Sequence, residues 1–208
     1  MRKIVGIISI WAGLCLALAF AVQLAWADPG PARLTAEQSA SKILSLLNDP
    51  AFKDPATKPE IQAKIEAEIL HLFDFEEFSS RTIGPNWRNF TPDQKLRFQK
   101  AFTELIRNSY IGALDSYGGE QINFTGELSS DGGSRVEIQM DFLAKGKAYP
   151  VAFRLLVKDD RWVVYDVNIE GISMIRNYRD QFRDILVNGS AEVLISRVEA
   201  KAAEEAAK

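Results

Sequence analysis

The sequence predicts an α+β fold in which a twisted antiparallel four-stranded sheet is wrapped by helices. The main observation is a change in hydrophobic period near residue 120. Before that point apolar residues recur every three or four positions, as on one face of a helix. After it they alternate, as in a strand with one buried face. Gly118-Gly119 separates the two halves. Helices followed by consecutive strands indicate an α+β domain rather than a parallel α/β sheet.

The first 27 residues have the features of a secretory signal peptide. Two basic residues precede an apolar run (4–24), and Ala25-Trp26-Ala27 forms a small-x-small cleavage site. Because the run is longer than most signal cores, an uncleaved membrane anchor is the alternative. We expect cleavage after residue 27, which leaves 28–208 as a single periplasmic domain. Cys15 is then removed, and the mature chain contains no cysteine.

Two helices are expected before residue 74. The first begins at Thr35, which can form a capping box with Gln38, and it carries a leucine-rich apolar face. Residues 48–58 contain two prolines and form a break. The second helix begins near Pro59 and places isoleucines at every fourth position. Both faces are apolar enough to be buried.

The next two helices are rich in aromatic residues. A short helix follows Asp74 and ends at Gly84-Pro85. Thr91 is placed to cap a long helix that ends before Gly118. Pro92 stands in the first turn of this helix, where a missing N–H costs nothing. These two helices and the segment between them carry most of the aromatic side chains that precede Gly118.

Four strands are expected after residue 120. They start at Ile122, cover 136–142 and 149–157, and end with 162–169. Gly146-Lys147 and Asp159-Asp160 are candidate two-residue hairpin turns. With both turns, the register places on one face Val136, Ile138, Met140, Phe142, Val151, Phe153, Leu155, Val157, Trp162 and Val164. The other face begins polar and becomes apolar at Leu156, Val163, Tyr165 and Val167.

A helix is expected directly after the last strand. Gly171 breaks the strand, Ser173 is placed to cap the helix, and apolar residues at helical spacing cover 172–187. A last helix follows Asn188-Gly189-Ser190. Its end, 199–208, is rich in alanine, glutamate and lysine, and we expect this tail to be frayed.

Charge and residue types restrict the function. Without residues 1–27 the chain has 23 basic and 28 acidic residues, a net charge of −5, which argues against a nucleic-acid partner. Asp166 and Glu170, beside Tyr165, could serve an isomerase-like general base. The simpler interpretation is a carboxylate that caps the next helix or pairs with Arg176 or Arg179. His71 has no second histidine or cysteine for a metal site. We therefore expect a binding protein rather than an enzyme.

Two long stretches carry the most specific signal. They are DFEEFSSRTIGPNWRNFTPDQKLRFQKAFTELIRNSY (74–110) and WVVYDVNIEGISMIRNYRDQFRDIL (162–186). In content and order they resemble the MlaC family, also called the toluene-tolerance or ABC-transporter auxiliary family. The resemblance spans most of residues 35–200. A hopanoid-associated branch of the family shares these motifs.

The resemblance implies a periplasmic phospholipid carrier with a deep apolar cavity. Phospholipid would be the cargo, with no other cofactor and no metal. The implied partners are an inner-membrane ABC transporter with its substrate-binding ring and an outer-membrane lipoprotein complex, between which lipid would be shuttled. The residues expected to line or close the cavity are Phe75, Phe78, Trp87, Phe98, Phe102, Tyr110, Trp162, Val164, Ile172 and Ile175, with Val151 and Phe153 added from the register.

Several alternatives remain at this point. The ligand could be another apolar molecule, such as a hopanoid, or the chain could be a small isomerase or an adaptor with a filled core. Phosphate at the cavity rim could meet one of five arginines, although such arginines more often form surface ion pairs. These five are Arg81, Arg88, Arg154, Arg176 and Arg179.

Overall fold

The computed structural model describes residues 30–207, and the predicted signal peptide (1–27) lies outside them. Within this range no helix is both long and apolar enough to cross a bilayer. In chain order the elements are α1 (Pro31–Asn48), α2 (Pro50–Lys53), α3 (Lys58–Leu72), α4 (Phe75–Ile83), the 3-10 helix η1 (Gly84–Asn89), α5 (Pro92–Asp115), β1 (Gln121–Ser130), the 3-10 helix η2 (Asp131–Gly133), β2 (Arg135–Ala144), β3 (Lys147–Lys158), β4 (Arg161–Ile169), β5 (Ile172–Ser173), α6 (Met174–Asn188) and α7 (Ala191–Ala206).

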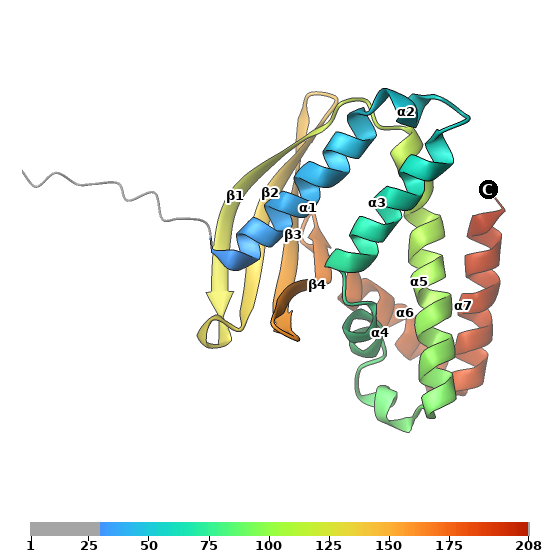
Figure 1. Cartoon of the computed structure of the whole chain (residues 1–208). Helices are drawn as coiled ribbons and strands as arrows, with labels where there is room; N and C mark the ends of the chain where they lie inside the picture. Colours follow the sequence, from blue (N-terminus) through green and yellow to red (C-terminus); the bar gives the residue numbers. More distant parts are fainter. Residues whose placement is uncertain (1–29, 208) are drawn as a thin grey trace, which may run out of the picture.

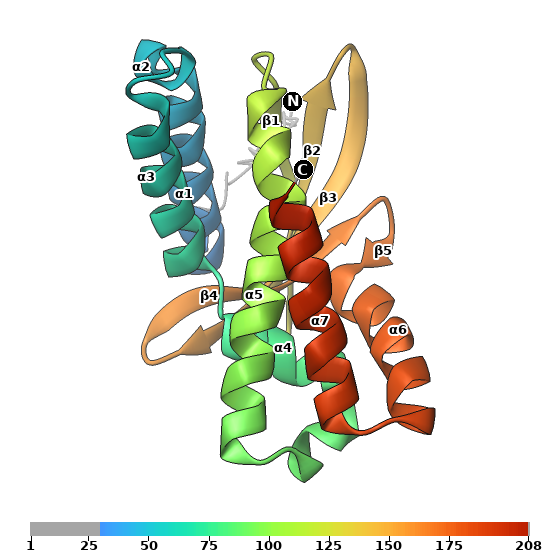
Figure 2. The ribbon, with the colours of Figure 1, turned by 90° about the vertical axis from the view of Figure 1, so that its right-hand side faces the viewer.

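The sheet is open and antiparallel, with its strands in the order β1-β2-β3-β4-β5 (Figures 1 and 2). Four strands were predicted. The fifth is the short strand β5, which pairs with the end of β4. Glu170 and Gly171, with φ values of 51° and 85°, form the tight turn that reverses the chain between them. The helix predicted from residue 172 therefore begins only at Met174, with Ser173 as its cap.

Two-residue turns connect β2 to β3 and β3 to β4. The second turn is Asp159-Asp160, as predicted, but the first is Lys145-Gly146 rather than Gly146-Lys147. Moving a two-residue turn by one position shifts the strand pairing by two residues, so every side chain keeps its face. The predicted apolar face survives for this reason, and Ile138 lies opposite Phe153.

Val167 lies on the opposite face from the one predicted. The register of β3 against β4 shifts between Arg154 and Leu155, where Tyr165 is the extra residue on β4. Val167 consequently pairs with Phe153 and is buried with the residues of that face. Strict alternation along the sequence gave the wrong face because it takes no account of a bulge.

The helices form two pairs beside the sheet. The first pair is α1 and α3. α1 crosses the apolar face of the sheet, and the chain turns back through α2 so that α3 runs beside α1 (Figure 1). α5 and α7 form the second pair, with α4 and α6 at one end of it (Figure 2). Ala32 and Ala36 of α1 are fully buried in its contact with the sheet, and their small size lets this helix approach the sheet closely. Asp74 N donates to Val164 O at 2.9 Å, which ties the α3–α4 connection to β4.

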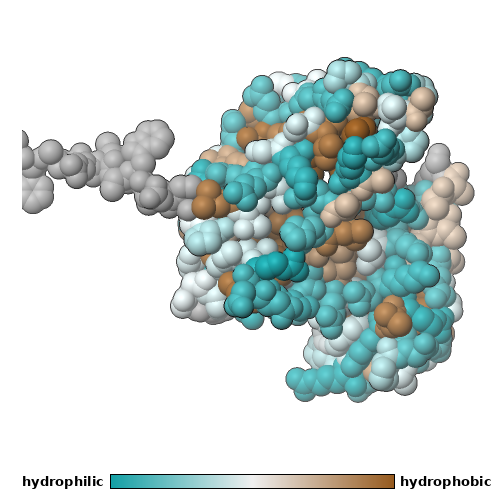
Figure 3. Space-filling model, viewed as in Figure 1, coloured by the Kyte–Doolittle hydropathy of each residue, from teal (hydrophilic) through white to brown (hydrophobic). Residues whose placement is uncertain are grey.

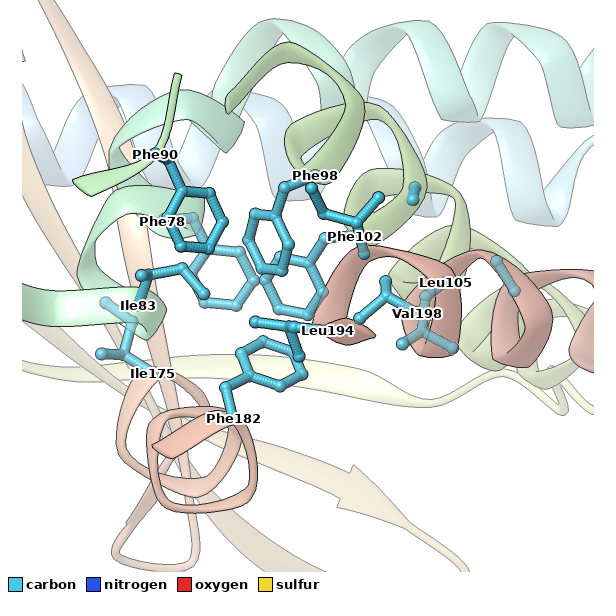
Figure 4. Packing of buried hydrophobic residues seen from close by; sticks show 13 residues of the cluster. Phe78, Ile83, Phe90, Phe98, Phe102, Leu105, Ile175, Phe182, Leu194 and Val198 are labelled. Carbon is cyan, nitrogen blue, oxygen red and sulfur yellow. The ribbon is translucent and has the colours of Figure 1, made fainter. Parts of the chain in front are cut away.

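Among residues 30–207, three clusters of buried apolar residues hold these elements together. The sheet core lies under α1 and contains Ala32, Ala36, Leu72, Val136, Ile138, Met140, Leu155, Val164 and Val167. The hairpin core joins α1, α2 and α3 through Leu47, Phe52, Ile61 and Ile65. The aromatic core joins α4 to α7 through Phe78, Ile83, Phe90, Phe98, Ala101, Phe102, Leu105, Ile175, Phe182, Leu194, Ile195, Val198 and Ala202 (Figure 4).

Some helix ends differ from the prediction. The Thr91 cap is confirmed, because Thr91 Oγ1 accepts from Gln94 N at 3.2 Å and Gln94 Oε1 accepts from Thr91 N at 3.0 Å. Thr35 does not cap α1, which begins at Pro31, so that the Thr35 hydroxyl donates to the Pro31 carbonyl.

The expectation of a frayed tail from residue 199 is wrong. α7 continues to Ala206, and Ala202 is only 3% exposed in the aromatic core. Asn108 Nδ2 of α5 also donates to the Ala202 carbonyl at 3.0 Å. Ala202, one of the alanines that suggested a frayed tail, is thus part of the contact between α7 and α5.

Candidate functional site

An apolar groove lies between the two helix pairs. It has a volume of about 160 Å³ and is referred to below as the α3–α5 groove. Apolar side chains are exposed between α3 and α5 in the space-filling view (Figure 3). The lining residues are Glu66, Ile69 and Leu70 of α3, Phe75 of α4, and Thr103, Ile106, Arg107, Tyr110 and Leu114 of α5.

The groove forms because α3 and α5 carry more apolar side chains than the hairpin and aromatic cores bury. On α3, Ile61 and Ile65 point into the hairpin core, whereas Leu70 lies about 100° around the helix from Ile69. Leu70 is consequently 55% exposed. On α5, Phe98 and Phe102 are fully buried, and apolar residues on the neighbouring face line the groove. Each helix thus has apolar side chains that stay partly exposed at the groove in the described part of the chain, such as Leu70 on α3 and Tyr110 on α5.

Polar contacts cross the groove along its outer edge. Glu66 Oε1 lies 3.0 Å from Arg107 Nη2, and Lys58 Nζ lies 2.9 Å from Asp115 Oδ1. Gln62 Nε2 also donates to Asp115 Oδ1 at 3.4 Å. All of these contacts connect α3 to α5. Half-exposed ion pairs of this kind contribute little to the stability of a fold. They therefore connect α3 to α5 but can be broken at little cost in free energy.

One end of the groove opens into a charged hollow, referred to below as the mouth. Its volume is about 480 Å³, and it shares Leu70, Phe75 and Thr103 with the groove. The other residues that line it are His71, Phe73, Asp74, Glu76, Gln99, Lys158, Asp159, Arg161 and Val163. The apolar groove and the polar mouth therefore adjoin at these three shared residues.

The β3–β4 turn places two cations at the mouth. Lys158 and Arg161 flank the turn and lie directly opposite each other in the sheet. Lys158 Nζ lies 2.8 Å from Asp74 Oδ2 and 3.0 Å from Glu76 Oε2, and its hydrogen bond to Asp74 raises its pKa. Arg161 Nη1 instead lies 3.3 Å from His71 Nδ1. Lys158 is thus compensated by carboxylates, whereas Arg161 forms no ion pair with a carboxylate among residues 30–207.

The twelve residues predicted to line a cavity fall into separate places. Phe75 and Tyr110 line the groove, while Ile172 in β5 is 63% exposed and belongs to none of the sheet, hairpin and aromatic cores. Phe78, Phe98, Phe102 and Ile175 belong to the aromatic core, with Trp87 packed against it. Val164 belongs to the sheet core, with Val151, Phe153 and Trp162 packed against it.

The aromatic core is a packed interior. The ring of Phe102 stacks on Phe78 and on Phe98, with centroids 5.3 Å and 5.5 Å apart, and meets Phe182 edge to face (Figure 4). Side chains in such contact exclude other molecules. Phe78, Phe98 and Phe102, which were expected to line or close the cavity, pack here against one another, and their contact with lipid stays a prediction.

The groove and mouth residues that the sequence reasoning missed gave two kinds of signal. Leu70 follows Ile69 directly on a helix, so the two side chains cannot both face the same core. The sequence could therefore have predicted that Leu70 lies on a second face of the helix. Lys158 and Arg161 are neighbours because they pair across the β3–β4 turn, so only the strand register reveals them as a pair. None of the five arginines predicted at the rim lines the mouth.

The carboxylates considered for catalysis have structural partners. Asp166 is 2% exposed and accepts hydrogen bonds from Ser173 Oγ at 2.6 Å, Ile175 N at 3.1 Å and Arg154 Nη1 at 3.1 Å. It anchors the start of α6, which confirms the capping interpretation. Glu170 is exposed at the β4–β5 turn. Across residues 30–207, the His, Cys, Asp and Glu side chains form no group of three that could hold a metal ion.

Comparison with known sequences gives consistent matches. The family model described as MlaC protein matches residues 37–200. The chain is 22% identical to the intermembrane phospholipid transport system binding protein MlaC of Haemophilus influenzae, over 81% of this chain and 80% of that protein. It is 32% identical to the toluene tolerance protein ttg2D of Pseudomonas putida, over 48% of this chain and 46% of that protein.

A solved structure shares the fold. It is the phospholipid-binding protein from Ralstonia solanacearum, determined in complex with a phospholipid, and it superposes with a TM-score of 0.74. The match covers 85% of this chain and 99% of that one at 22% identity. The α+β architecture with an antiparallel sheet is thus confirmed. Because the family model matches most of the chain, the protein belongs to the MlaC family.

Proposed function

We propose that this protein is a periplasmic phospholipid carrier that encloses acyl chains in the α3–α5 groove. The observation that carries the proposal is that an apolar groove adjoins a charged mouth and shares Leu70, Phe75 and Thr103 with it. A phospholipid has the same two parts in the same order. Membership of the MlaC family and the phospholipid bound to the Ralstonia protein support this class of ligand.

Loading requires the groove to widen. Its volume of about 160 Å³ is close to the roughly 150 Å³ of an engineered apolar cavity that holds a single benzene. A full acyl chain is longer than this space allows. The contacts between α3 and α5 are half-exposed and polar at the edge, so separation of the two helix pairs breaks few strong interactions.

Release requires a partner. Burial of acyl chain contributes about 0.8 kcal/mol per CH₂, so two chains of about 15 carbons gain on the order of 20 kcal/mol over water. A lipid held that strongly does not exchange through bulk water on a useful timescale. We infer handover in direct complexes, with an inner-membrane ABC transporter and its substrate-binding ring on one side and an outer-membrane lipoprotein complex on the other. No bond is made or broken, so the role is binding without catalysis.

The experiment compares uptake of lipid by groove and control variants. The 28–208 chain is incubated with phospholipid vesicles and separated from them, and bound lipid is measured by mass spectrometry. Leu70→Asn places an amide in the groove, where it finds no partner beside an acyl chain, and bound lipid should fall about tenfold. Leu96→Asn is the control, because Leu96 is similarly exposed but lies outside the groove.

Three outcomes separate the possibilities. Loss of lipid in Leu70→Asn with normal loading of Leu96→Asn supports the groove as the binding site. Equal loading of both variants overturns this site assignment. Uptake of a phosphorus-free apolar molecule by the wild-type chain, with no phospholipid, moves the ligand to the hopanoid-like class.

A further inference from the structure

The groove explains how acyl chains are held but not how the headgroup is received. We propose that Arg161, supported by His71, binds the phosphate of the lipid headgroup at the mouth. This inference rests on the carrier function proposed above and adds a specificity-determining residue to it. It starts from the contrast between the two cations that flank the β3–β4 turn.

Lys158 has its charge satisfied within the protein. It contacts the carboxylates of Asp74 and Glu76 at 2.8 Å and 3.0 Å, and the Asp74 carboxylate is buried. These contacts fix the turn against the start of α4. A phosphate that approached Lys158 would have to compete with both carboxylates, so this lysine acts as a structural anchor of the mouth.

Arg161 differs in its surroundings. Within residues 30–207 no carboxylate lies within 4.0 Å of its guanidinium, and its side-chain contact is with His71 Nδ1 at 3.3 Å. Because a guanidinium only donates hydrogen bonds, Nδ1 must accept, and the proton of a neutral His71 is then on Nε2. The imidazole thus orients Arg161 on one side and offers an N–H donor on the other.

A phosphate matches this arrangement. A guanidinium can give two parallel N–H groups to two phosphate oxygens, and the resulting charge-assisted hydrogen bonds are stronger than neutral ones. Arg161 and His71 line the same hollow as Leu70 and Phe75, which also line the groove. A lipid whose chain enters between α3 and α5 therefore has its headgroup at the mouth. Asp159 lines the mouth as well and can accept from an amine or hydroxyl beyond the phosphate.

The test measures headgroup preference as a ratio within one sample. The 28–208 chain is incubated with mixed vesicles that present phosphatidylglycerol and diacylglycerol with the same acyl chains. The ratio of the two lipids in the protein fraction is then measured by mass spectrometry. A general loss of stability changes the amount of both lipids but not their ratio. The wild-type chain should favour phosphatidylglycerol at least tenfold beyond the vesicle ratio.

Three variants isolate the contribution of Arg161. Arg161→Gln should lower the ratio about tenfold, and Arg161→Lys should give an intermediate value because it keeps the charge but loses the fork geometry. Arg176→Gln makes the same change of charge at an exposed position in the first turn of α6, outside the mouth, and should keep the wild-type ratio. Since Arg161 is exposed, the glutamine variant is expected to fold.

The outcomes distinguish this inference from the carrier proposal. An unchanged ratio in Arg161→Gln, with both lipids loaded, overturns the inference and leaves the carrier proposal standing. A wild-type chain that takes up neither lipid overturns the carrier proposal, and the inference with it. Calorimetric titration with inorganic phosphate covers the other source of the same chemistry. If free phosphate binds only when Arg161 is present, while the lipid ratio does not depend on Arg161, the site recognises free phosphate and the headgroup assignment is wrong.

Discussion

The carboxylate of Glu66 on α3 lies 3.0 Å from the guanidinium of Arg107 on α5, across the outer edge of the apolar groove. Both residues also line that groove. This ion pair joins the two helix pairs that must separate for an acyl chain to enter. It therefore stands where a contact can affect the rate of loading more than the stability of the fold.

The first prediction concerns this ion pair. Glu66→Gln should lower the free energy of unfolding by less than about 1 kcal/mol, because the pair is partly exposed. It should also speed lipid uptake from fluorescently labelled vesicles, followed by stopped-flow fluorescence. Glu60→Gln is the matched control, since Glu60 pairs with Lys64 within α3 and its pair does not cross the groove. Equal uptake rates in the two variants would show that the Glu66–Arg107 ion pair does not limit the opening of the groove.

The second prediction separates the core from the groove. Phe102 is fully buried and stacks on two other rings, so Phe102→Ala should destabilise the protein by about 3–5 kcal/mol in urea unfolding. Tyr110 is exposed at the groove, and Tyr110→Ala should cost at most about 1 kcal/mol while reducing bound lipid. A Phe102→Ala chain with normal stability but no bound lipid would contradict the distinction.

The third prediction concerns the buried carboxylate at the start of α6. Asp166→Asn replaces one acceptor oxygen by a donor, which leaves a hydrogen-bond donor such as Ser173 Oγ, or the charge of Arg154, without its partner. The expected destabilisation is about 2–4 kcal/mol in chemical unfolding. Glu170→Gln, at the exposed turn nearby, should change stability by less than about 0.5 kcal/mol. Similar, small effects from both substitutions would show that Asp166 does not anchor α6.

The fourth prediction is a pH dependence within the α1–α3 pair. Ser39 Oγ and Lys42 Nζ of α1 donate to the buried carboxylate of Glu68 on α3 at 2.8 Å and 2.5 Å. The hydrogen bond from Lys42 lowers the pKa of Glu68 below its usual 4.5 against the opposing effect of burial. A lowered pKa in the folded state means that this stabilisation is present above pH 4.5 and is lost as the pH falls through the folded-state pKa.

Glu68→Gln removes the titrating group and gives the test. The difference in unfolding free energy between wild type and Glu68→Gln should be largest at neutral pH and should shrink below pH 4.5. Glu104→Gln, at an exposed position on α5, is the control for the change of charge. A difference that stays constant between about pH 7 and about pH 3 would contradict the assigned role of Glu68.

Much of the fold could be predicted from residue spacing. The period change at Gly118-Gly119, the Thr91 cap and the Ser173 cap all correspond to observed elements, because each depends on local chemistry. The face of β2 and β3 was right even though the first turn was displaced, since register errors of two residues preserve faces. The bulge at Tyr165 could not be predicted in this way, because it depends on how β4 pairs with β3.

The site was harder to predict than the fold. Phe102 and Tyr110 both belong to apolar faces of α5, and spacing alone does not distinguish a side chain that fills a core from one that lines a groove. The distinction depends on which helix packs against each face. Arg161 is part of the site only because the β3–β4 turn carries it to the ends of α3 and α4, far away in sequence.

The central claim is that the mature chain carries a phospholipid, and the most direct test is the identity of the molecule it holds. The measurement is mass spectrometry of an organic extract from the 28–208 protein, purified from a Gram-negative periplasm without detergent. The account predicts phospholipid in near-stoichiometric amount. A stoichiometric lipid without phosphorus would contradict it. The absence of any bound lipid, followed by failure to take up phospholipid from vesicles, would contradict it as well.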